Sequence, residues 1–292
     1  MEKLEREQYV CLDVGGTEIK AACMDVYGDI SGGIRHFPAR ADEDAERILT
    51  HFADIVREVR LPEMNLAGIR MAFPGPFDYE NGISLMQGLG KYDKLYQASV
   101  RRGLSDLLGI GKERILFVND AAAFALGEMG FGEAYGAERA LFICIGTGCG
   151  SAFGVNGKIA SAGTPGVPRS GYVYDAPFLE SCIDDYLSRR GLMALTRECL
   201  GTALDGKALS QRVLHKDAAA RNCFLIFGRR IQEALSPFLD TFCPEVLCFG
   251  GQITGSGTMF LPPVEKACRE RGIRFYVTKD TSLRTLQGLT RL

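Results

Sequence analysis

The sequence predicts an α/β protein with two related domains that face a ligand-binding cleft. The chain of 292 residues has room for two domains of ordinary size, and short apolar runs alternate with helical patterns along it. A hairpin pattern occurs twice, as YVCLDVGGTEIKAACMDVYGDI (9–30) and RALFICIGTGCGSAFGVNGKI (139–159). In both copies the first turn is rich in Gly and Thr and the second ends in Gly-x-Ile, which indicates a duplicated mixed-sheet unit. A cleft between two such domains is a common ligand site.

The first part of the chain predicts a sheet flanked by helices. Strands are expected at 9–14, 19–26 and 28–37, followed by a helix over 42–60. That helix carries one apolar face at helical spacing. Further strands at 66–75 and 114–120 precede an Ala-rich helix. We assign residues 1–117 to a smaller N-terminal α/β domain.

The remainder of the chain repeats the pattern with more helix. After the hairpins of 139–159, helical periodicity covers 177–200 and 216–242. A buried strand with a Gly-Gly turn follows at 245–254, then a strand at 273–278 and a terminal helix. We assign residues 118–278 to a larger α/β domain and expect the helix of about 279–292 to pack back on the first domain.

Composition and charge exclude several classes of protein. The net charge of −2 and the absence of a basic run give no reason to expect a nucleic-acid partner. The charged start MEKLEREQYV argues against a signal peptide, and no segment approaches 18 apolar residues, so no membrane span is expected. The ten cysteines include no C-x-x-C pair, which favours buried reduced thiols and a cytoplasmic location.

The stretch DVGGTEIK (13–20) has the composition of a phosphate-binding turn. Asp13 ends a strand, and Gly15 and Gly16 allow backbone N–H groups to approach an anion closely. Thr17 adds a hydroxyl group and Lys20 a positive charge. It is not a P-loop, because no G-x4-G-K-[S/T] pattern is present. A plain hairpin turn remains the alternative.

Two further glycine turns follow apolar strands. In IGTGCGS (145–151) the glycines weaken a hairpin between apolar strands, and backbone amides that hold a phosphate would explain them. Two such hairpins facing a cleft would clamp a polyphosphate. In CFGGQIT (248–254), Gly250 and Gly251 give room for a nucleotide base against the backbone; the alternative is a tight strand-to-helix turn.

The stretch FVNDAAAF carries a carboxylate between a strand and a helix. Asp120 is well placed there to accept a proton from a substrate hydroxyl. Asn119 is suited to hydrogen bonds with sugar hydroxyls. The alternative is that Asp120 is only the N-cap of the helix, and this motif alone favours the cap.

Five motifs together resemble the ROK family of sugar kinases and sugar-responsive repressors: LDVGGTEIK, MAFPGPFD, FVNDAAA, ICIGTGCGSA and PEVLCFGG. They occur in the family's order and rough spacing from about Tyr9 to the C-terminus. The resemblance implies an actin/hexokinase-like (ribonuclease H-like) fold. It also implies ATP-dependent, glucokinase-like phosphorylation of a sugar or sugar-like hydroxyl, with Mg²⁺ carried in by ATP.

The resemblance also implies a role for each matching residue. Asp120 corresponds to the base that takes the proton from the attacking sugar hydroxyl, Asn119 to a ligand of sugar hydroxyls, and Gly75 to a backbone contact with the sugar. The residues implied to bind ATP are Asp13, Gly15, Gly16, Thr17 and Lys20 in the first phosphate motif, Gly146, Thr147, Gly148 and Gly150 in the second, and Gly250 and Gly251 beside the adenosine.

The sequence departs from the family after the second phosphate motif. ROK sugar kinases continue with G-E-x-G-H and a cysteine cluster that binds zinc, whereas this chain reads GTPGV, with Thr164 in place of Glu and Val167 in place of His. Cys182 falls on the last zinc cysteine and Asp184 on a second sugar-binding Glu. A lone thiol cannot hold a structural zinc, which takes four ligands, so we expect no zinc.

The altered loop leaves the substrate open. A site built to bond hydroxyl groups discriminates by them, so either the substrate differs from glucose and N-acetylhexosamines or other residues substitute. The candidates are Arg169, Tyr172, Tyr174 and Asp175, and Arg169 would favour an anionic group. The alternative is that the whole loop is a structural lid that binds no ligand.

A different class of protein is also consistent with this loop, namely a non-catalytic ROK-like sensor that binds sugar or nucleotide. A DNA-binding repressor is less expected, since about eight residues precede the first strand and leave no room for a helix-turn-helix. A homodimer is expected by analogy with the family alone.

Overall fold

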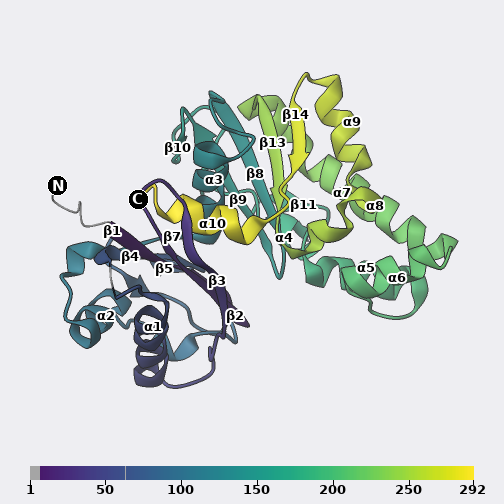
Figure 1. Cartoon of the computed structure of the whole chain (residues 1–292). Coiled ribbons are helices and arrows are strands. Elements are labelled where there is room, and N and C mark those ends of the chain that lie inside the picture. Colours follow the sequence, from purple (N-terminus) through teal and green to yellow (C-terminus); the bar gives the residue numbers. More distant parts are fainter. Residues whose placement is uncertain (1–6, 63) are drawn as a thin grey trace. The chain divides into compact units, whose positions relative to one another are not determined.

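A computed structural model describes residues 7–62 and 64–292 of the chain (Figure 1). The chain forms two compact units. Unit 1 runs to Gly132 and includes Ser282–Leu292, and unit 2 spans Glu133–Thr281. This grouping places the helix that begins at Asp120 in unit 1, whereas the sequence analysis divides the chain after residue 117. The boundary of the two domains stays a prediction.

Unit 1 is built on a sheet of five strands in the order β3-β2-β1-β4-β7. Strands β1 (Glu7–Val14), β2 (Glu18–Met24) and β3 (Ile30–Pro38) are antiparallel neighbours. Strands β4 (Asn65–Phe73) and β7 (Ile115–Asn119) run parallel to β1. The parallel strands are apolar because helices cover both faces of the sheet.

Each face of this sheet is covered by its own pair of helices (Figure 1). Helix α1 (Ala45–Val59) and helix α2 (Val100–Leu108) bury their apolar sides on one face, and α3 (Asp120–Phe131) and α10 (Thr281–Leu289) cover the other. Asp44 caps α1 by accepting a hydrogen bond from the Arg47 amide. The short elements are β5 (Phe77–Asp78), β6 (Ile83–Ser84), η1 (Asp93–Leu95) and η2 (Lys112–Arg114).

Helices α3 and α10 approach each other closely through two glycines. A Cβ atom on Gly127 would lie 1.8 Å from the carbonyl oxygen of Arg284, and one on Gly288 would lie 1.8 Å from that of Ala123. Leu286 and Leu289 are fully buried beside this contact. Only residues without a side chain permit this spacing of the two backbones.

Substitution Gly288→Ala is therefore expected to destabilise the protein by about 1–3 kcal/mol, because overpacking forces the two helices apart. Alanine has the higher helix propensity, so the loss would be steric in origin. Urea unfolding of the variant measures the effect. Gly255→Ala is the control, since a Cβ there meets no atom within 4 Å. An unchanged midpoint for Gly288→Ala would contradict the described packing.

Unit 2 contains a second sheet of five strands, in the order β10-β9-β8-β13-β14. Strands β8 (Arg139–Ile145), β9 (Cys149–Val155) and β10 (Lys158–Ile159) form antiparallel hairpins. Strands β13 (Val246–Gly250) and β14 (Arg274–Val277) are parallel to β8. Both sheets thus begin with an antiparallel hairpin and continue with parallel strands, as the duplicated sequence pattern predicts.

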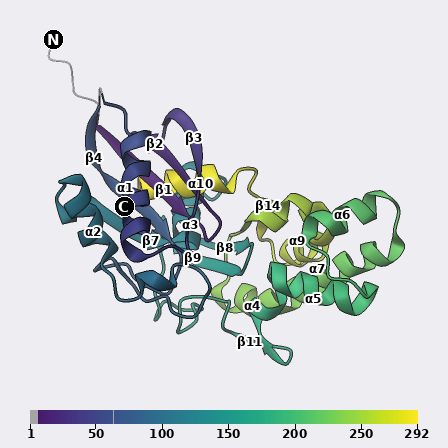
Figure 2. The ribbon, with the colours of Figure 1, turned by 90° about the horizontal axis from the view of Figure 1, so that it is seen from below.

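Helices pack around the long helix α7 (Ala218–Phe242) in unit 2 (Figure 2). Its neighbours include α5 (Arg189–Leu200), α6 (Gly206–Leu214) and α9 (Pro262–Glu270). The apolar core between these helices and the sheet includes the fully buried Phe227. The short elements are β11 (Pro177–Phe178), β12 (Ser181–Cys182), α4 (Ile183–Tyr186), η3 (Gln252–Ser256) and α8 (Gly257–Phe260).

The helix predicted over 177–200 is wrong at its beginning. Residues 177–182 form the small hairpin of β11 and β12, and the first helical turn begins at Ile183. Leu179 has a positive φ of 52° in the turn, a conformation that no helix contains. Within the described ranges, no helix is both long and apolar enough to cross a membrane.

Candidate active site

Of the predicted sugar-side residues, Gly75, Asn119 and Asp120 lie with Asp13 at one edge of the sheet in unit 1, whereas Asp184 belongs to unit 2. Asp13 pairs with Ala72 of β4, and the next residue of β4, Phe73, pairs with Asn119 of β7. Because β1, β4 and β7 are parallel, their carboxyl ends share this edge, where ligands commonly bind in α/β sheets. Gly75 follows β4 after one residue, Pro74, and is exposed.

Asn119, and not Asp120, is the N-cap of helix α3. Its Oδ1 accepts hydrogen bonds from the amides of Ala121 (3.0 Å) and Ala122 (3.3 Å), and its Nδ2 donates to the Tyr79 hydroxyl (3.3 Å). The cap interpretation of Asp120 is therefore wrong, because its neighbour already fills that position. The same bonds leave Asn119 little capacity for a sugar, and its role as a sugar ligand stays a prediction.

Asp120 is the first residue of α3, and its side chain is exposed. One carboxyl oxygen accepts from the Ala121 amide (2.9 Å). Desolvation by the protein around the carboxyl raises the pKa of Asp120, although the amide of Ala121 and the positive charge of Lys91 oppose the rise. A carboxylate with a raised pKa is a stronger proton acceptor.

Asp13 lies within electrostatic range of Asp120. Burial raises the pKa of Asp13 to about 7, repulsion by Asp120 adds to the rise, and Lys20 opposes it. Lys20 is the cross-strand partner of Asp13, and its Nζ donates to the Ser282 hydroxyl (2.5 Å). A carboxyl group whose pKa is raised by burial and by a second carboxyl is typical of functional sites.

The first glycine turn is a tight hairpin that is stabilised by a hydrogen bond from a side chain outside the turn. The Gly15 amide donates to the Glu18 carbonyl (3.0 Å), and a Cβ on Gly15 would lie 2.7 Å from that oxygen. The hydroxyl of Tyr92 donates to the Gly15 carbonyl (2.9 Å). Gly16 and Thr17 are exposed at the tip. Tyr92 is completely buried and belongs to none of the motifs that the sequence displays.

The second glycine turn joins β8 to β9 and is stabilised by Asp184. The Gly146 amide donates to the Gly148 carbonyl (2.9 Å), and Thr147 is exposed at the tip. Asp184 Oδ1 accepts from the Cys149 amide (2.7 Å), and Asp184 Oδ2 accepts from Arg190 (3.0 Å). Since both carboxyl oxygens have protein partners, the contact of Asp184 with a sugar stays a prediction.

Replacing Asp184 with alanine is expected to destabilise unit 2 by about 1–3 kcal/mol, because the Cys149 amide loses its acceptor. The same change should raise the KM for ATP more than the KM for the acceptor, since it loosens the turn that is predicted to bind phosphate. Thermal unfolding and the two KM values measure this. A rise in the acceptor KM alone would support direct contact with the sugar.

The two glycines that are predicted to lie beside the adenosine, Gly250 and Gly251, are next to this second turn. Gly250 pairs with Cys144 of β8, as does Gly150 on the other side of that strand. Gly251 has a φ of 94°, and a Cβ on it would lie 2.4 Å from the Ile145 carbonyl oxygen. A cavity of about 400 Å³ opens here, lined by Gly251, Gln252, Thr254, Gly255, Val277, Thr278, Lys279 and Thr281.

The altered loop is packed into unit 2 around the positions that differ from the family. Val167 contacts the apolar core, and the buried Val173 donates its amide to the Ser151 hydroxyl (2.9 Å). Arg139 donates to the Pro165 carbonyl (2.7 Å). The side chains that sequence analysis offers as substitutes are partly accessible or exposed at the surface of the loop: Arg169, Tyr172, Tyr174 and Asp175.

No metal site is evident at the position of the family's zinc cluster. Across residues 7–62 and 64–292, no group of three or more His, Cys, Asp or Glu side chains is arranged to hold a metal ion. The thiol of Cys182 lies 3.7 Å from an Asp185 oxygen. The expectation of no zinc stays a prediction.

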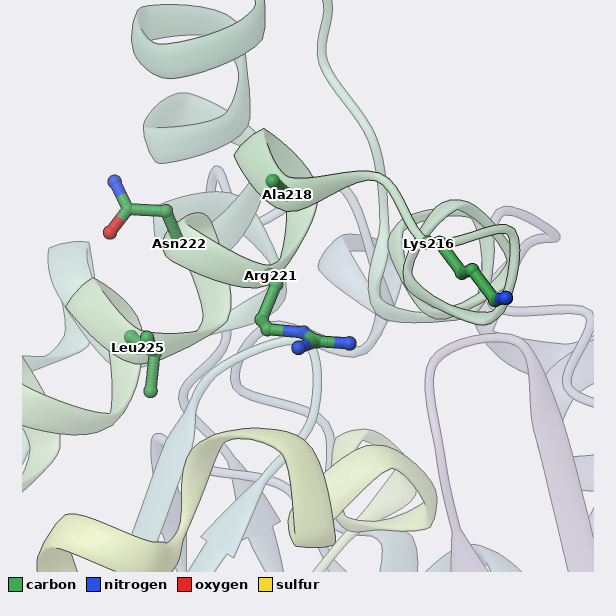
Figure 3. A pocket seen from close by; sticks show the side chains of 5 residues that line it. All are labelled: Lys216, Ala218, Arg221, Asn222 and Leu225. Carbon is green, nitrogen blue, oxygen red and sulfur yellow. The ribbon is translucent and has the colours of Figure 1, made fainter.

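A second cavity, of about 530 Å³, lies at the start of α7, away from the predicted site residues of unit 2 in sequence. Figure 3 shows its lining: Lys216, Ala218, Arg221, Asn222 and Leu225. The amides at the start of α7 are already capped by Asp217, which also pairs with Arg212. All five lining residues are exposed, so the cavity has no buried polar side chain that would point to a ligand.

Comparison with known proteins gives a consistent result. The ROK family model matches residues 9–286. N-acetyl-D-glucosamine kinase of Mannheimia succiniciproducens is 26% identical over 263 residues, which cover 83% of each chain. The DNA-binding transcriptional repressor Mlc of Escherichia coli is 19% identical over 247 residues, or 79% of this chain and 60% of Mlc. The crystal structure of a ROK hexokinase from Thermus thermophilus has a TM-score of 0.79 and 22% identity, with 97% of this chain and 96% of that chain covered, which confirms the predicted fold.

Proposed function

The chain belongs to the ROK family, and on that premise we propose that it transfers the γ-phosphate of ATP to a hydroxyl group of a sugar or sugar-like substrate. The observation that carries the proposal is Asp120, an exposed residue that does not cap its helix and whose carboxyl has a raised pKa. The relative from Mannheimia succiniciproducens is itself a sugar kinase.

The proposed reaction uses Asp120 as a general base. As the substrate hydroxyl oxygen bonds to the γ-phosphorus, Asp120 takes the hydroxyl proton, and the bond between the γ-phosphorus and the β,γ-bridging oxygen breaks to release ADP. The backbone amides around Gly16 and Gly148 would hold the phosphate groups, and Gly251 would contact the adenosine. Mg²⁺ arrives with ATP as part of the substrate and offsets the phosphate charge.

The identity of the acceptor depends on the altered loop, because two of the family's hydrogen-bonding positions hold Thr164 and Val167. Val167 contacts the apolar core and has no polar group to offer. The acceptor therefore either lacks the hydroxyl pattern that a Glu and a His recognise or is bound by other loop residues.

A non-catalytic sensor of sugar or nucleotide is the second candidate, favoured by the same loop and by the similarity to Mlc. A panel of sugars and sugar derivatives with Mg²⁺ and ATP, read out as ADP formation, separates the two functions. Turnover with any member supports the kinase. Thermal stabilisation by a sugar without turnover across the panel supports the sensor and overturns the kinase.

We also propose a cytoplasmic protein that forms a homodimer and does not bind nucleic acid, in agreement with the net charge of −2. Sedimentation equilibrium at micromolar concentration tests the dimer. A single species of about 32 kDa, the mass of one chain, would contradict it.

A further inference from the structure

Lys91 lies against the first phosphate turn. A Cβ placed on Gly16 would be 3.1 Å from Lys91 Cδ and 3.7 Å from Lys91 Cβ. The side chain is partly buried. Its aliphatic part thus covers the tip residue of the turn that would hold a phosphate group of ATP, which places its ammonium group close to that turn.

The backbone on both sides of Lys91 is firmly held. The amides of Leu89 and Gly90 both donate to the Asp93 carboxylate, each at 3.0 Å. The Tyr92 amide donates to the Ala41 carbonyl (2.7 Å), and the Tyr92 hydroxyl bonds to the phosphate turn itself. The hydrogen bond from Tyr92, the next residue in the sequence, therefore fixes the backbone of Lys91 beside the turn, as is expected in a preorganised site.

The ammonium group of Lys91 forms no ion pair with a carboxylate of the described residues. In the described part of the chain, no Asp or Glu oxygen lies within 4.0 Å of its ammonium nitrogen, which also has no hydrogen-bond partner there. Lys20, the other lysine of the site, bonds to Ser282. The charge of Lys91 nevertheless reaches the Asp120 carboxyl and favours its ionised form.

We propose that Lys91 is a catalytic residue whose ammonium group binds the oxygen atoms of the γ-phosphoryl group during its transfer. The proposal rests on the proposed kinase function. In that reaction the transferred group lies between the hydroxyl beside Asp120 and the remaining phosphates beside Gly16. Lys91 touches Gly16 and acts on Asp120, so it is the cation suited to this position, where a fixed positive charge stabilises phosphoryl transfer.

The first experiment compares Lys91→Met with Lys94→Met. Methionine keeps the unbranched shape and most of the length of the side chain and removes its charge, and Lys94 is an exposed lysine on the same segment. With Mg²⁺, ATP and the best acceptor of the panel, Lys91→Met should lower kcat about 10²–10³-fold, with the acceptor KM changed less than threefold. Lys94→Met should match the unchanged protein, and Lys91→Arg should retain intermediate activity.

The second experiment measures binding of the non-hydrolysable ATP analogue AMPPNP and of ADP, each with Mg²⁺, by calorimetry. Lys91→Met should weaken AMPPNP about tenfold and leave ADP unchanged, because only the analogue carries a γ-phosphate. The calorimetry tests the role of Lys91 even if the unchanged protein phosphorylates no acceptor. A failure to phosphorylate any acceptor would overturn the proposed kinase function and not the role of Lys91. Equal loss or no loss for both nucleotides, or a raised acceptor KM at unchanged kcat, would overturn the role of Lys91.

Discussion

Substitution Asp120→Asn is expected to lower kcat by about 10²–10⁴-fold and to leave nucleotide affinity within about threefold. The asparagine keeps the shape of the side chain but cannot accept the hydroxyl proton, and general-base catalysis accounts for a loss of this size. Helix α3 should stay intact, because Asn119 and not Asp120 caps it. Steady-state kinetics and AMPPNP calorimetry measure the two effects.

Asp106→Asn is the matched control for this change, since Asp106 is an exposed aspartate on helix α2 of the same unit. It should keep both kcat and stability. Full activity of Asp120→Asn would show that another group is the base. For the unchanged protein, the raised pKa of Asp120 predicts that kcat falls on the acid side, where the carboxyl becomes protonated.

Substitution Asp13→Asn is expected to stabilise the protein at pH 8 while lowering its activity at least tenfold. The pKa of Asp13 is about 7 in the folded chain, against an ordinary value of 3.8, so the folded state binds more protons between these values. Folding stability from this group is therefore complete below pH 3.8 and decreases as the pH rises to about 7. Asparagine does not ionise, so the variant avoids the loss of folding stability that the unchanged protein suffers at pH 8, which is roughly 1–4 kcal/mol.

Thermal unfolding of Asp13→Asn and the unchanged protein over pH 4–8 provides the measurement. The difference in Tm should be small at pH 4 and grow toward pH 8. A lower Tm for the variant at pH 8 would show that Lys20 stabilises the Asp13 carboxylate more than burial destabilises it. A stabilised variant with full activity would remove Asp13 from the phosphate site.

The strands and the duplicated hairpins could be predicted because their signals are local. Apolar runs bounded by glycine turns identify β1, β2, β8 and β9 within a few residues. Helix α2 was not predicted, since Val100 and Leu104 are its only buried residues among the positions described. Helical periodicity wrongly predicts a helix over the hairpin at 177–182, because periodicity does not detect a positive φ at Leu179.

The glycine motifs of the candidate site could likewise be located from the sequence, while the partners of its side chains could not. Hydrogen bonds that join Asp184 to Cys149 connect residues 35 positions apart, and no spacing rule indicates such a contact. Lys91 and Tyr92 carry no motif at all. Their position beside Gly15 and Gly16 follows from the path of the chain after β6, which only the fold determines.

The close packing of α10 on α3 has a consequence for synthesis of the protein. Unit 1 needs Ser282–Leu292 to cover one face of its sheet, yet the ribosome makes all of Glu133–Thr281 first. The apolar surface around Cys11, Ala72 and Ala123 therefore stays uncovered while unit 2 emerges. Unit 2 is expected to fold first during translation, with unit 1 completed only after residues 282–292 leave the exit tunnel.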